Sequence, residues 1–144
     1  MNIRVRKAEA DEITWINSCY DTVEFLHSDL GNEVVAIAEV DNQRAGLGRL
    51  VKVGDDIFEL GGMLVFEQYR GLGLSKKIIE FLIKQATCYK AIYCIPFEHL
   101  DKLYYSMGFN NCNNFTSVPE KVIDKYNWCK SHYPHNVLLL EINS

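Results

Sequence analysis

A glycine-rich turn near the middle of the chain is the feature best suited to bind a ligand. Residues 59–86 read as a strand, then the turn over 68–73, then an amphipathic helix. A turn that opens a helix presents unpaired backbone N–H groups and the positive end of the helix dipole at one point. Arg70, Lys76 and Lys77 add full positive charges nearby. Such a place suits a phosphate group.

The turn does not match the best-known phosphate-binding motifs. A Walker A loop would need Gly-x4-Gly-Lys-Ser/Thr, which is absent here. The dinucleotide fingerprint would need a third glycine and a downstream acid in a second βαβ unit, and both are missing. An ordinary glycine-rich turn between a strand and a helix is therefore the simplest alternative to a phosphate site.

Two short signatures resemble those of the GCN5-related N-acetyltransferase (GNAT) superfamily. Gln68-x-x-Gly71-x-Gly73 is similar to the loop with which this family binds the pyrophosphate of an acyl-CoA, and Val65 precedes it at the family's spacing. Residues 103–109 resemble the second signature, Tyr-x-x-x-Gly-Phe. The resemblance covers roughly residues 3–116 and is strongest over 57–109. Two signatures in the right order are more specific than either one alone.

The resemblance implies how acetyl-CoA, the acyl donor, would bind. Backbone N–H groups of the turn would hold the pyrophosphate, and the backbone at Met63 and Val65 would pair with the pantetheine arm. Gly61 and Gly62 interrupt the preceding strand, where glycine often marks a β-bulge. In this family a bulge splays the central strand and admits the thioester; the alternative is that the glycines only relieve packing against a helix. The expected donor-binding residues are Met63, Leu64, Val65, Gln68, Tyr69, Arg70, Gly71, Leu72, Gly73, Leu74 and Ser75.

Glu59 is the expected general base. An alkylammonium titrates near about pH 10, so a base or a chain of waters must help to deprotonate it near neutrality. Glu59 stands six residues before Val65 and resembles in position the base of the histone-acetylating members of the family. Burial would raise its pKa and help it to accept a proton. The alternatives are a glutamate in solvent or paired with a lysine, with ordered water or another residue as the base.

Tyr104 is the expected general acid, because it matches the tyrosine of the second signature. Its phenol could bind the thioester sulfur and protonate the leaving thiolate. The alternative is a core tyrosine bonded to a carbonyl, and Tyr105 is the neighbour with which it could be confused. One departure from the family concerns Phe97, which stands where an asparagine often binds pantetheine. That contact is therefore absent or made by backbone.

We predict no metal site. Cys129, His132 and His135 have the spacing of ligands on one helix face, but Pro134 interrupts any helix there and no fourth ligand is obvious. Cys94 is expected to be a small core residue rather than a nucleophile, because direct transfer needs no acyl-enzyme.

Composition limits the class of protein. The 144 residues, 48% hydrophobic and 24% charged, fit one soluble globular domain over residues 1–144. A net charge of −4 argues against nucleic-acid binding, and no apolar run is long enough for a membrane span or a signal peptide. Five scattered cysteines without a Cys-x-x-Cys pair indicate reduced thiols and a cytoplasmic location.

The remaining sequence predicts a mixed α/β domain whose central sheet is mixed, mostly antiparallel and flanked by helices, with a βαβ unit around the glycine turn. Hydrophobic periodicity predicts strands over residues 3–6, 33–40, 44–53, 57–65, 91–95, 109–116 and 136–142. The same patterns predict helices over 8–20, 74–86, 98–107 and 119–130. Asp41 and Asn42 predict a two-residue hairpin turn. This order agrees with the GNAT fold, with the acyl-CoA site at a splayed central strand.

These features predict an N-acetyltransferase that transfers the acetyl group of acetyl-CoA to a primary amine by direct attack on the thioester. The acceptor would be a small-molecule amine or a peptide amine, and a homodimer is compatible with the sequence. Trp15, Tyr20, Glu24 and Phe25 are expected to line the acceptor side. One alternative is a catalytically silent regulatory module that binds CoA or acetyl-CoA with the same fold. Another is an unrelated phosphate-binding protein that shares only the Gly-x-Gly turn.

Overall fold

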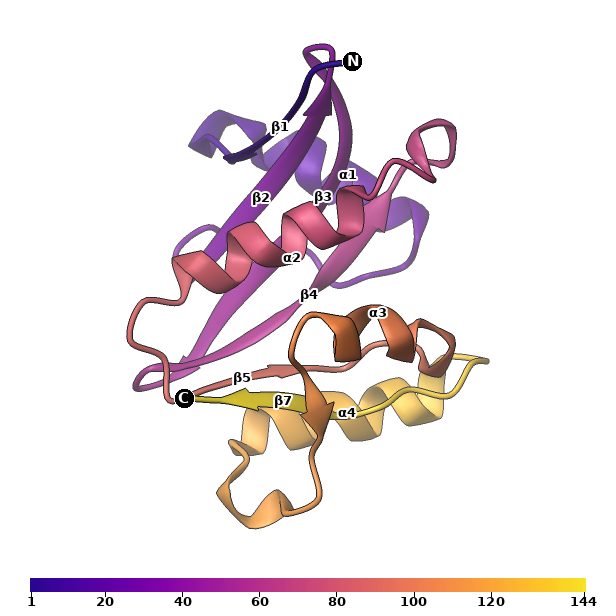
Figure 1. Ribbon diagram of the computed structural model, residues 1–144. Coiled ribbons are helices and arrows are strands. Elements are labelled where there is room, and N and C mark those ends of the chain that lie inside the picture. The colour runs from indigo at the N-terminus through magenta and orange to yellow at the C-terminus, as the bar shows by residue number, and fades with distance from the viewer.

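Alternating and continuous apolar patterns along the chain assemble into a seven-stranded sheet in the computed structural model, which describes residues 1–144 (Figure 1). The strand order is β1-β2-β3-β4-β5-β7-β6. Only β4 and β5 run parallel, so the predicted mixed, mostly antiparallel sheet is confirmed. The strands are β1 (Ile3–Lys7), β2 (Glu33–Val40), β3 (Gln43–Gly54), β4 (Ile57–Val65), β5 (Ala91–Cys94), β6 (Asn110–Asn111) and β7 (Leu140–Asn143).

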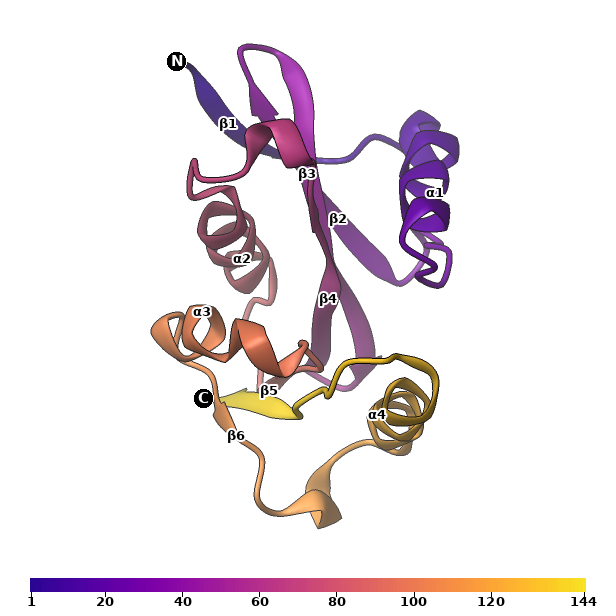
Figure 2. The same ribbon diagram turned by 90° about the vertical axis from the view of Figure 1, so that its right-hand side faces the viewer.

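Four α-helices cover the two faces of the sheet. They are α1 (Ile13–Thr22), α2 (Leu74–Gln85), α3 (Asp101–Ser106) and α4 (Glu120–His132). In Figure 2 the sheet is seen edge-on, with α2 and α3 on one face and α1 and α4 on the other. None of these helices combines the length and the apolar character that crossing a membrane requires.

The β2–β3 hairpin lies between β1 and the central strand β4. Its turn consists of Asp41 and Asn42, with φ of 49° and 67°, between the paired residues Val40 and Gln43. Positive φ at both central residues is the mark of a type I′ turn, whose twist matches that of the strands. The predicted hairpin turn is therefore confirmed.

Helix α2 is the crossover between the parallel strands β4 and β5, as a βαβ unit requires. Its apolar residues Ile78, Ile79 and Leu82 are buried against the sheet. It lies directly over β3 at Gly48, where a Cβ atom would come within 2.5 Å of Met63 Sδ and 2.8 Å of Ile78 Cγ2. The absence of a side chain at this position is what lets the helix approach the strand so closely.

A β-bulge interrupts β4 where the sequence places two adjacent glycines. Leu47 of β3 pairs with Leu64 and Arg49 pairs with Gly61, so β4 has one more residue than β3 between these pairs. Gly62 has φ of +60°, a conformation that favours glycine. A Cβ atom there would lie 2.5 Å from the Tyr20 hydroxyl oxygen. The predicted bulge is confirmed, and glycine is required at its centre.

Four predicted elements differ from those observed, and one is the helix predicted over 98–107, whose residues Glu98–Leu100 form a 3₁₀ turn before α3. The strand predicted over 109–116 shrinks to β6 of two residues, and Asn114 instead begins a 3₁₀ turn by accepting a hydrogen bond from Thr116 N at 3.1 Å. Asparagine side chains compete with strand pairing in this way. The helix predicted over 8–20 begins with a 3₁₀ turn, Ala10–Glu12. The strand predicted over 136–142 is regular only in β7, with an isolated bridge between Phe97 and Val137 before it.

A cluster of charged residues joins β1, β2 and the start of α1. Glu12 is buried, and its carboxylate accepts hydrogen bonds from Arg6 at 2.7 Å and from Arg44 at 3.1 Å. Glu39 bonds Arg4 at 2.6 Å and Arg6 at 2.9 Å. Hydrogen bonding to Arg6 is the main cause that lowers the pKa of Glu12 to about 2, and it outweighs the opposing effect of burial.

The close contact of α2 with β3 predicts that Gly48→Ala destabilises the fold. The added methyl group would overlap Met63 and Ile78, and overpacking of this kind typically costs about 1–3 kcal/mol of unfolding free energy. Urea unfolding would measure the loss. Gly54→Ala on the same strand is the control, because a Cβ atom there meets Ile57 only at 3.5 Å or more. Equal stability of the two variants would contradict the packing.

The Glu12 cluster predicts a dependence of stability on acid. Because the pKa of Glu12 falls from 4.5 to about 2 on folding, its contribution is complete above pH 4.5 and is lost as the pH falls toward 2. Glu12→Gln should therefore cost about 2 kcal/mol at neutral pH, and this cost should shrink as the solution is acidified. Urea unfolding from pH 7 to pH 3 would test this. Glu80→Gln, an exposed change on α2, is the control that should show no such trend.

Candidate active site

A gap in the sheet between β4 and β5 forms the candidate site. The two strands pair only as far as Leu60 and Cys94, where β5 ends. β4 continues to Val65 and remains paired with β3 on its other side. The second half of β4 therefore has one unpaired edge inside the molecule, as the splayed strand of the prediction requires.

The unpaired edge presents backbone groups of Met63 and Val65 to the gap. Phe66 N donates to Ala45 O on β3 at 3.0 Å. Because backbone groups alternate in direction along a strand, those of Val65 and Met63 point away from β3. Val65 O is approached only by the exposed side chain of Arg70, with Nε at 3.4 Å. These are the two residues predicted to pair with the pantetheine arm.

A pocket passes through this gap and is lined from both faces of the sheet. Its volume is about 110 Å³. Met63, Cys94, Leu100 and Tyr104 line it near α2 and α3. Phe25, Arg49, Glu59, Lys125, Trp128 and Tyr133 line it on the side of α1 and α4. The two predicted catalytic residues, Glu59 and Tyr104, thus line one pocket.

Glu59 lies on β4 and is paired with a lysine of α4. Only 6% of the residue is exposed, and its Oε2 accepts a hydrogen bond from Lys125 Nζ at 2.6 Å. Pairing with a lysine was the alternative to catalysis, but the pair lies inside the pocket rather than on an outer surface. Gly61 is the next residue on this face of β4. A Cβ atom on Gly61 would lie 3.2 Å from Glu59 Oε2, so the glycine leaves that side of the carboxylate free of a side chain.

Tyr104 lies on α3 with its hydroxyl group unused by the protein. The residue is 4% exposed and its ring packs edge-on against Phe109 at 5.8 Å. No hydrogen bond joins its hydroxyl to another residue, in contrast to a core tyrosine bonded to a carbonyl. Burial raises the pKa of Tyr104 well above its usual value, so the phenol keeps its proton. It can therefore act as a donor to a group that enters the pocket.

The glycine turn leaves six consecutive backbone N–H groups without a partner. From Gly71 to Lys76, no N–H donates a hydrogen bond within the protein. Gly71 and Gly73 have φ of +85° and +75°, and no atom lies within 4 Å of the position of a Cβ on either. Gln68, Arg70 and the lysines beside the turn are exposed. A run of free N–H groups at the start of a 12-residue helix is well suited to a pyrophosphate.

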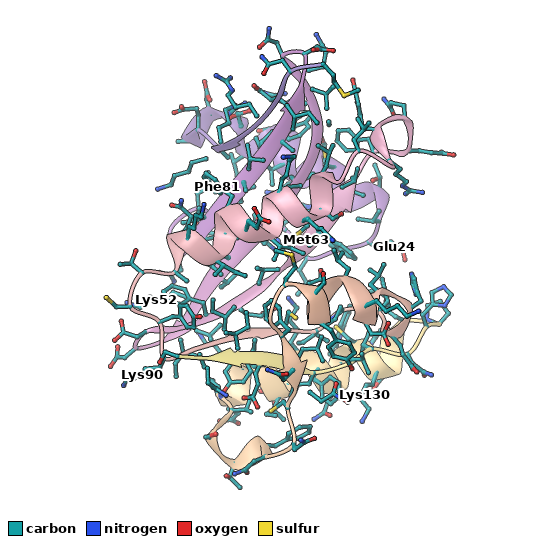
Figure 3. All side chains as sticks on the ribbon, in the orientation of Figure 1. Glu24, Lys52, Met63, Phe81, Lys90 and Lys130 are labelled. Carbon is teal, nitrogen blue, oxygen red and sulfur yellow. The ribbon has the colours of Figure 1, made fainter.

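The other predicted donor-binding residues have different places. Met63 points toward α2 and lies between α2 and α3 in Figure 3. Leu64 pairs with β3, and its side chain packs in the cluster beneath α1 rather than toward the gap. Tyr69 and Leu72 pack against the main core beside α2, and Leu74 is buried within it. The turn thus contributes mainly backbone groups, rather than side chains, to the site.

Of the residues expected on the acceptor side, only Phe25 lines the pocket. Tyr20 lies behind it and donates to Gly62 O at 2.9 Å. Trp15 is at the far end of the sheet, where it packs against Phe66 at 6.1 Å. Glu24 is exposed at the edge of the molecule (Figure 3). Trp15 and Tyr20 lie on α1 itself, and the sequence does not show which part of the sheet the helix covers, so their distance from the pocket could not be predicted.

Sequence reasoning missed the charged and aromatic pocket residues Arg49, Lys125, Trp128 and Tyr133, besides several aliphatic ones. Three of these four come from α4 or just beyond it, which packs on the sheet beside β5 in Figure 2. A lysine or tryptophan on an amphipathic helix has no signal that separates it from a surface residue. Arg49 did carry a signal, because a charged residue within an otherwise buried strand is unusual.

Phe97 and the triplet of Cys129, His132 and His135 pack within the protein. Phe97 lines the pocket and packs against Tyr133 at 5.4 Å. His132 stacks on Trp128 at 4.3 Å, whereas His135 packs against Phe97 at 5.8 Å. Cys129, by contrast, is buried. No group of three or more potential ligands is placed to hold a metal ion.

Known proteins share this architecture. An N-acetylglutamate synthase from Neisseria gonorrhoeae, complexed with coenzyme A and N-acetyl-glutamate, superposes with a TM-score of 0.76 at 16% identity, over 99% of this chain and 35% of that one. Rv2747 from Mycobacterium tuberculosis, in a complex that contains CoA, gives 0.76 at 18% identity over 98% and 99%. The ribosomal-protein-S18-alanine N-acetyltransferase from Escherichia coli gives 0.73 at 13% identity over 99% and 94%. The chain thus spans about a third of the length of the synthase.

Identities this low show a common fold and nothing finer. No curated protein matches the sequence. The sequence profile of the acetyltransferase (GNAT) domain, however, matches residues 31–111, which is more than half of the chain and includes the hairpin, the bulged strand, the glycine turn and Tyr104. The chain belongs to the GNAT acetyltransferase family.

Proposed function

We propose that the protein is an N-acetyltransferase that transfers the acetyl group of acetyl-CoA to a primary amine by direct attack on the thioester. The observation that carries this proposal is the pocket through the gap between β4 and β5, with Glu59 on one side and Tyr104 on the other. Amine and thioester would approach from opposite faces of the sheet and meet at the bulge. The CoA-containing complexes of two proteins of the same fold support the choice of donor.

The donor would be held by backbone alone over most of its length. The free N–H groups from Gly71 to Lys76 would bind the pyrophosphate, aided by the exposed Arg70. The inward-facing backbone of Met63 and Val65 would pair with the pantetheine arm, as an added strand pairs with a sheet edge. This pairing would set the thioester in the pocket.

The acceptor would enter between α1 and α4. Its ammonium group would lie beside Glu59, where the carboxylate takes a proton and later gives it to solvent. The free amine then attacks the thioester carbonyl and the C–N bond forms. As the C–S bond breaks, the nitrogen loses its remaining extra proton and the leaving thiolate gains one, so CoA leaves as its thiol. Lys125 keeps Glu59 fixed and satisfied while the pocket has no acceptor. An ammonium group can replace Lys125 at Oε2 without leaving a buried charge unpaired.

Tyr104 would stabilise the leaving sulfur. Its hydroxyl has no other partner, and its raised pKa ensures that it offers a proton rather than a negative charge. A hydrogen bond to sulfur would strengthen as negative charge develops in the transition state, which is the condition for a rate effect.

These comparisons support the donor but do not identify the acceptor. One related structure contains N-acetyl-glutamate, and another protein of the fold is named for an alanine of ribosomal protein S18. A small molecule and a residue of a protein are therefore both represented. A panel of amines, amino acids and short peptides, with thiol release as the readout, would identify the class.

Tyr104→Phe should lower turnover of acetyl-CoA by about tenfold or more, on the scale of a lost general acid, with little change in stability. Tyr105→Phe is a matched control: the neighbouring tyrosine is 40% exposed and bonds only Asn111 at 2.7 Å. Equal rates for Tyr104→Phe and wild type would remove Tyr104 from the mechanism. Undiminished CoA binding without turnover of any acceptor would favour the silent CoA-binding module.

Glu59→Gln should lower kcat about 100-fold near neutral pH, because the amide cannot accept the proton. The loss should shrink at higher pH, where more of the acceptor is already neutral. Lys125→Met is the comparison that separates base from ion pair, since it removes the lysine but keeps the carboxylate. If both variants lose the same activity at every pH, Glu59 acts through the ion pair and not as the base.

A further inference from the structure

We infer that the acceptor is a free amino acid with an apolar side chain, and that Arg49 is the residue that binds its carboxylate. This inference rests on the proposed function, because it names the substrate that the same pocket would take. It is carried by the placement of Arg49 and by the groups that surround it.

Arg49 is fixed in place by contacts that use only part of its guanidinium. It lies on β3 and is 5% exposed. Its Nη1 donates to Leu26 O at 2.9 Å and to Ser28 Oγ at 2.8 Å, and its guanidinium carbon lies 4.5 Å from the centre of the Tyr20 ring. A charged group held by a turn and an aromatic face is preorganised, so little entropy is lost when it binds a ligand.

The remaining donors of Arg49 have no partner in the protein. No residue accepts a hydrogen bond from its Nε or Nη2. The nearest carboxylate is Glu33, whose Oε1 lies 4.0 Å from Nη1 and makes no hydrogen bond. An arginine this well buried normally has its donors satisfied. Since Arg49 also lines the pocket, a ligand carboxylate can complete its hydrogen bonds.

Arg49 and Glu59 lie on one face of the sheet and line the same pocket, with Lys125 Nζ bonded to Glu59 at 2.6 Å. Arg49 pairs across the strands with Gly61, and Glu59 is two residues before Gly61 on β4. Diagonal neighbours of this kind have Cα atoms about 7–8 Å apart. Gly61 places no side chain between them. A molecule that carries an amine and a carboxylate a few bonds apart can therefore bind Glu59 with one group and Arg49 with the other.

The charges of the pocket favour such a zwitterion. Its lining contains two cations, Arg49 and Lys125, and one carboxylate, Glu59. Lys125 is already paired with Glu59, whereas Arg49 has only the Glu33 carboxylate at 4.0 Å from its Nη1, without a hydrogen bond between them. An amine without a negative group would meet two cations in a poorly solvated space, which disfavours it. A carboxylate on the same molecule removes that penalty.

The rest of the acceptor side is apolar and aromatic. Phe25 and Tyr133 have ring centres 6.4 Å apart, and Tyr133 also contacts Phe97 at 5.4 Å and Trp128 at 5.5 Å. All four rings line the pocket. They offer contact area to an aliphatic or aromatic side chain and no hydrogen-bonding group besides the Tyr133 hydroxyl and the Trp128 N–H. An apolar amino acid fits this set better than an acidic or basic one.

The test compares amino acids with their amides, which share the amine and side chain but lack the negative charge. Thiol release from acetyl-CoA would be measured with L-leucine, L-leucinamide, L-phenylalanine and L-phenylalaninamide. We expect kcat/KM for each acid to exceed that for its amide by about 10- to 100-fold, the range of a charge-assisted hydrogen bond. The amides also represent the N-terminus of a peptide, so the same comparison separates free amino acids from protein acceptors.

Arg49→Gln should reduce the ratio of acid to amide to near one. Arg44→Gln is the matched control: Arg44 lies on the same strand and also stacks on an aromatic ring, Trp15 at 4.4 Å, but outside the pocket. It should keep the wild-type ratio. Circular dichroism and melting temperature would show that each variant is folded, and the wild-type ratio stands even if Arg49→Gln does not fold.

Binding gives a second readout that does not need turnover. Calorimetry in the presence of CoA would compare N-acetyl-L-leucine with N-acetyl-L-leucinamide. Tighter binding of the carboxylate, lost in Arg49→Gln, supports the inference even if no acceptor is acetylated and the proposed function fails. Turnover of the amides as fast as the acids, or equal binding of both ligands, overturns the inference, and turnover of the amides leaves the proposed function intact.

Discussion

The site depends on the one extra residue that β4 inserts opposite β3. Before the bulge, Glu59 and Gly61 face α1 and α4; after it, Met63 faces α2. The bulge therefore reverses which face of the sheet the side chains occupy, so a single strand would contact both substrates of the proposed reaction. Gly62 holds this geometry with positive φ, and the Tyr20 hydroxyl holds the Gly62 carbonyl at 2.9 Å. Without the bulge, we would not expect β4 to separate from β5 after the Leu60–Cys94 pair.

Two charged residues, Glu59 and Arg49, are buried near the bulge beside the half-buried Lys125, and their positions follow from this break in the sheet. Glu59 and Arg49 each occupy a position on a strand whose neighbours are apolar, where an unpaired charge would be costly. Lys125 reaches Glu59 from α4, across 66 residues of sequence. A continuous sheet covered by a helix would offer these groups neither a pocket nor a ligand. Their burial is consistent with a site that is built to bind polar groups in a mostly apolar space.

The sequence predicted those parts of the structure that local interactions control. The hairpin turn at Asp41, the helix face of α2 and the bulge at Gly61 and Gly62 are set by residues close together in the chain, and all were confirmed. The glycine turn with its unpaired N–H groups could be predicted for the same reason, because turn and helix adjoin in sequence. The acceptor half could not, since Arg49, Lys125 and Tyr133 meet only through tertiary packing. The asparagines near β6 misled the strand prediction because their side chains bond locally.

Cysteine chemistry in the pocket also bears on how acetyl transfer would proceed. Cys94 ends β5 at the edge of the gap, where a covalent acetyl intermediate could form in principle. Burial, with a further effect of the Glu59 charge, raises the pKa of Cys94 well above its ordinary value. The thiol therefore stays protonated and is a poor nucleophile. Because amine and thioester can reach the gap from opposite faces, no relay through Cys94 is needed, and direct attack is the mechanism that this geometry favours.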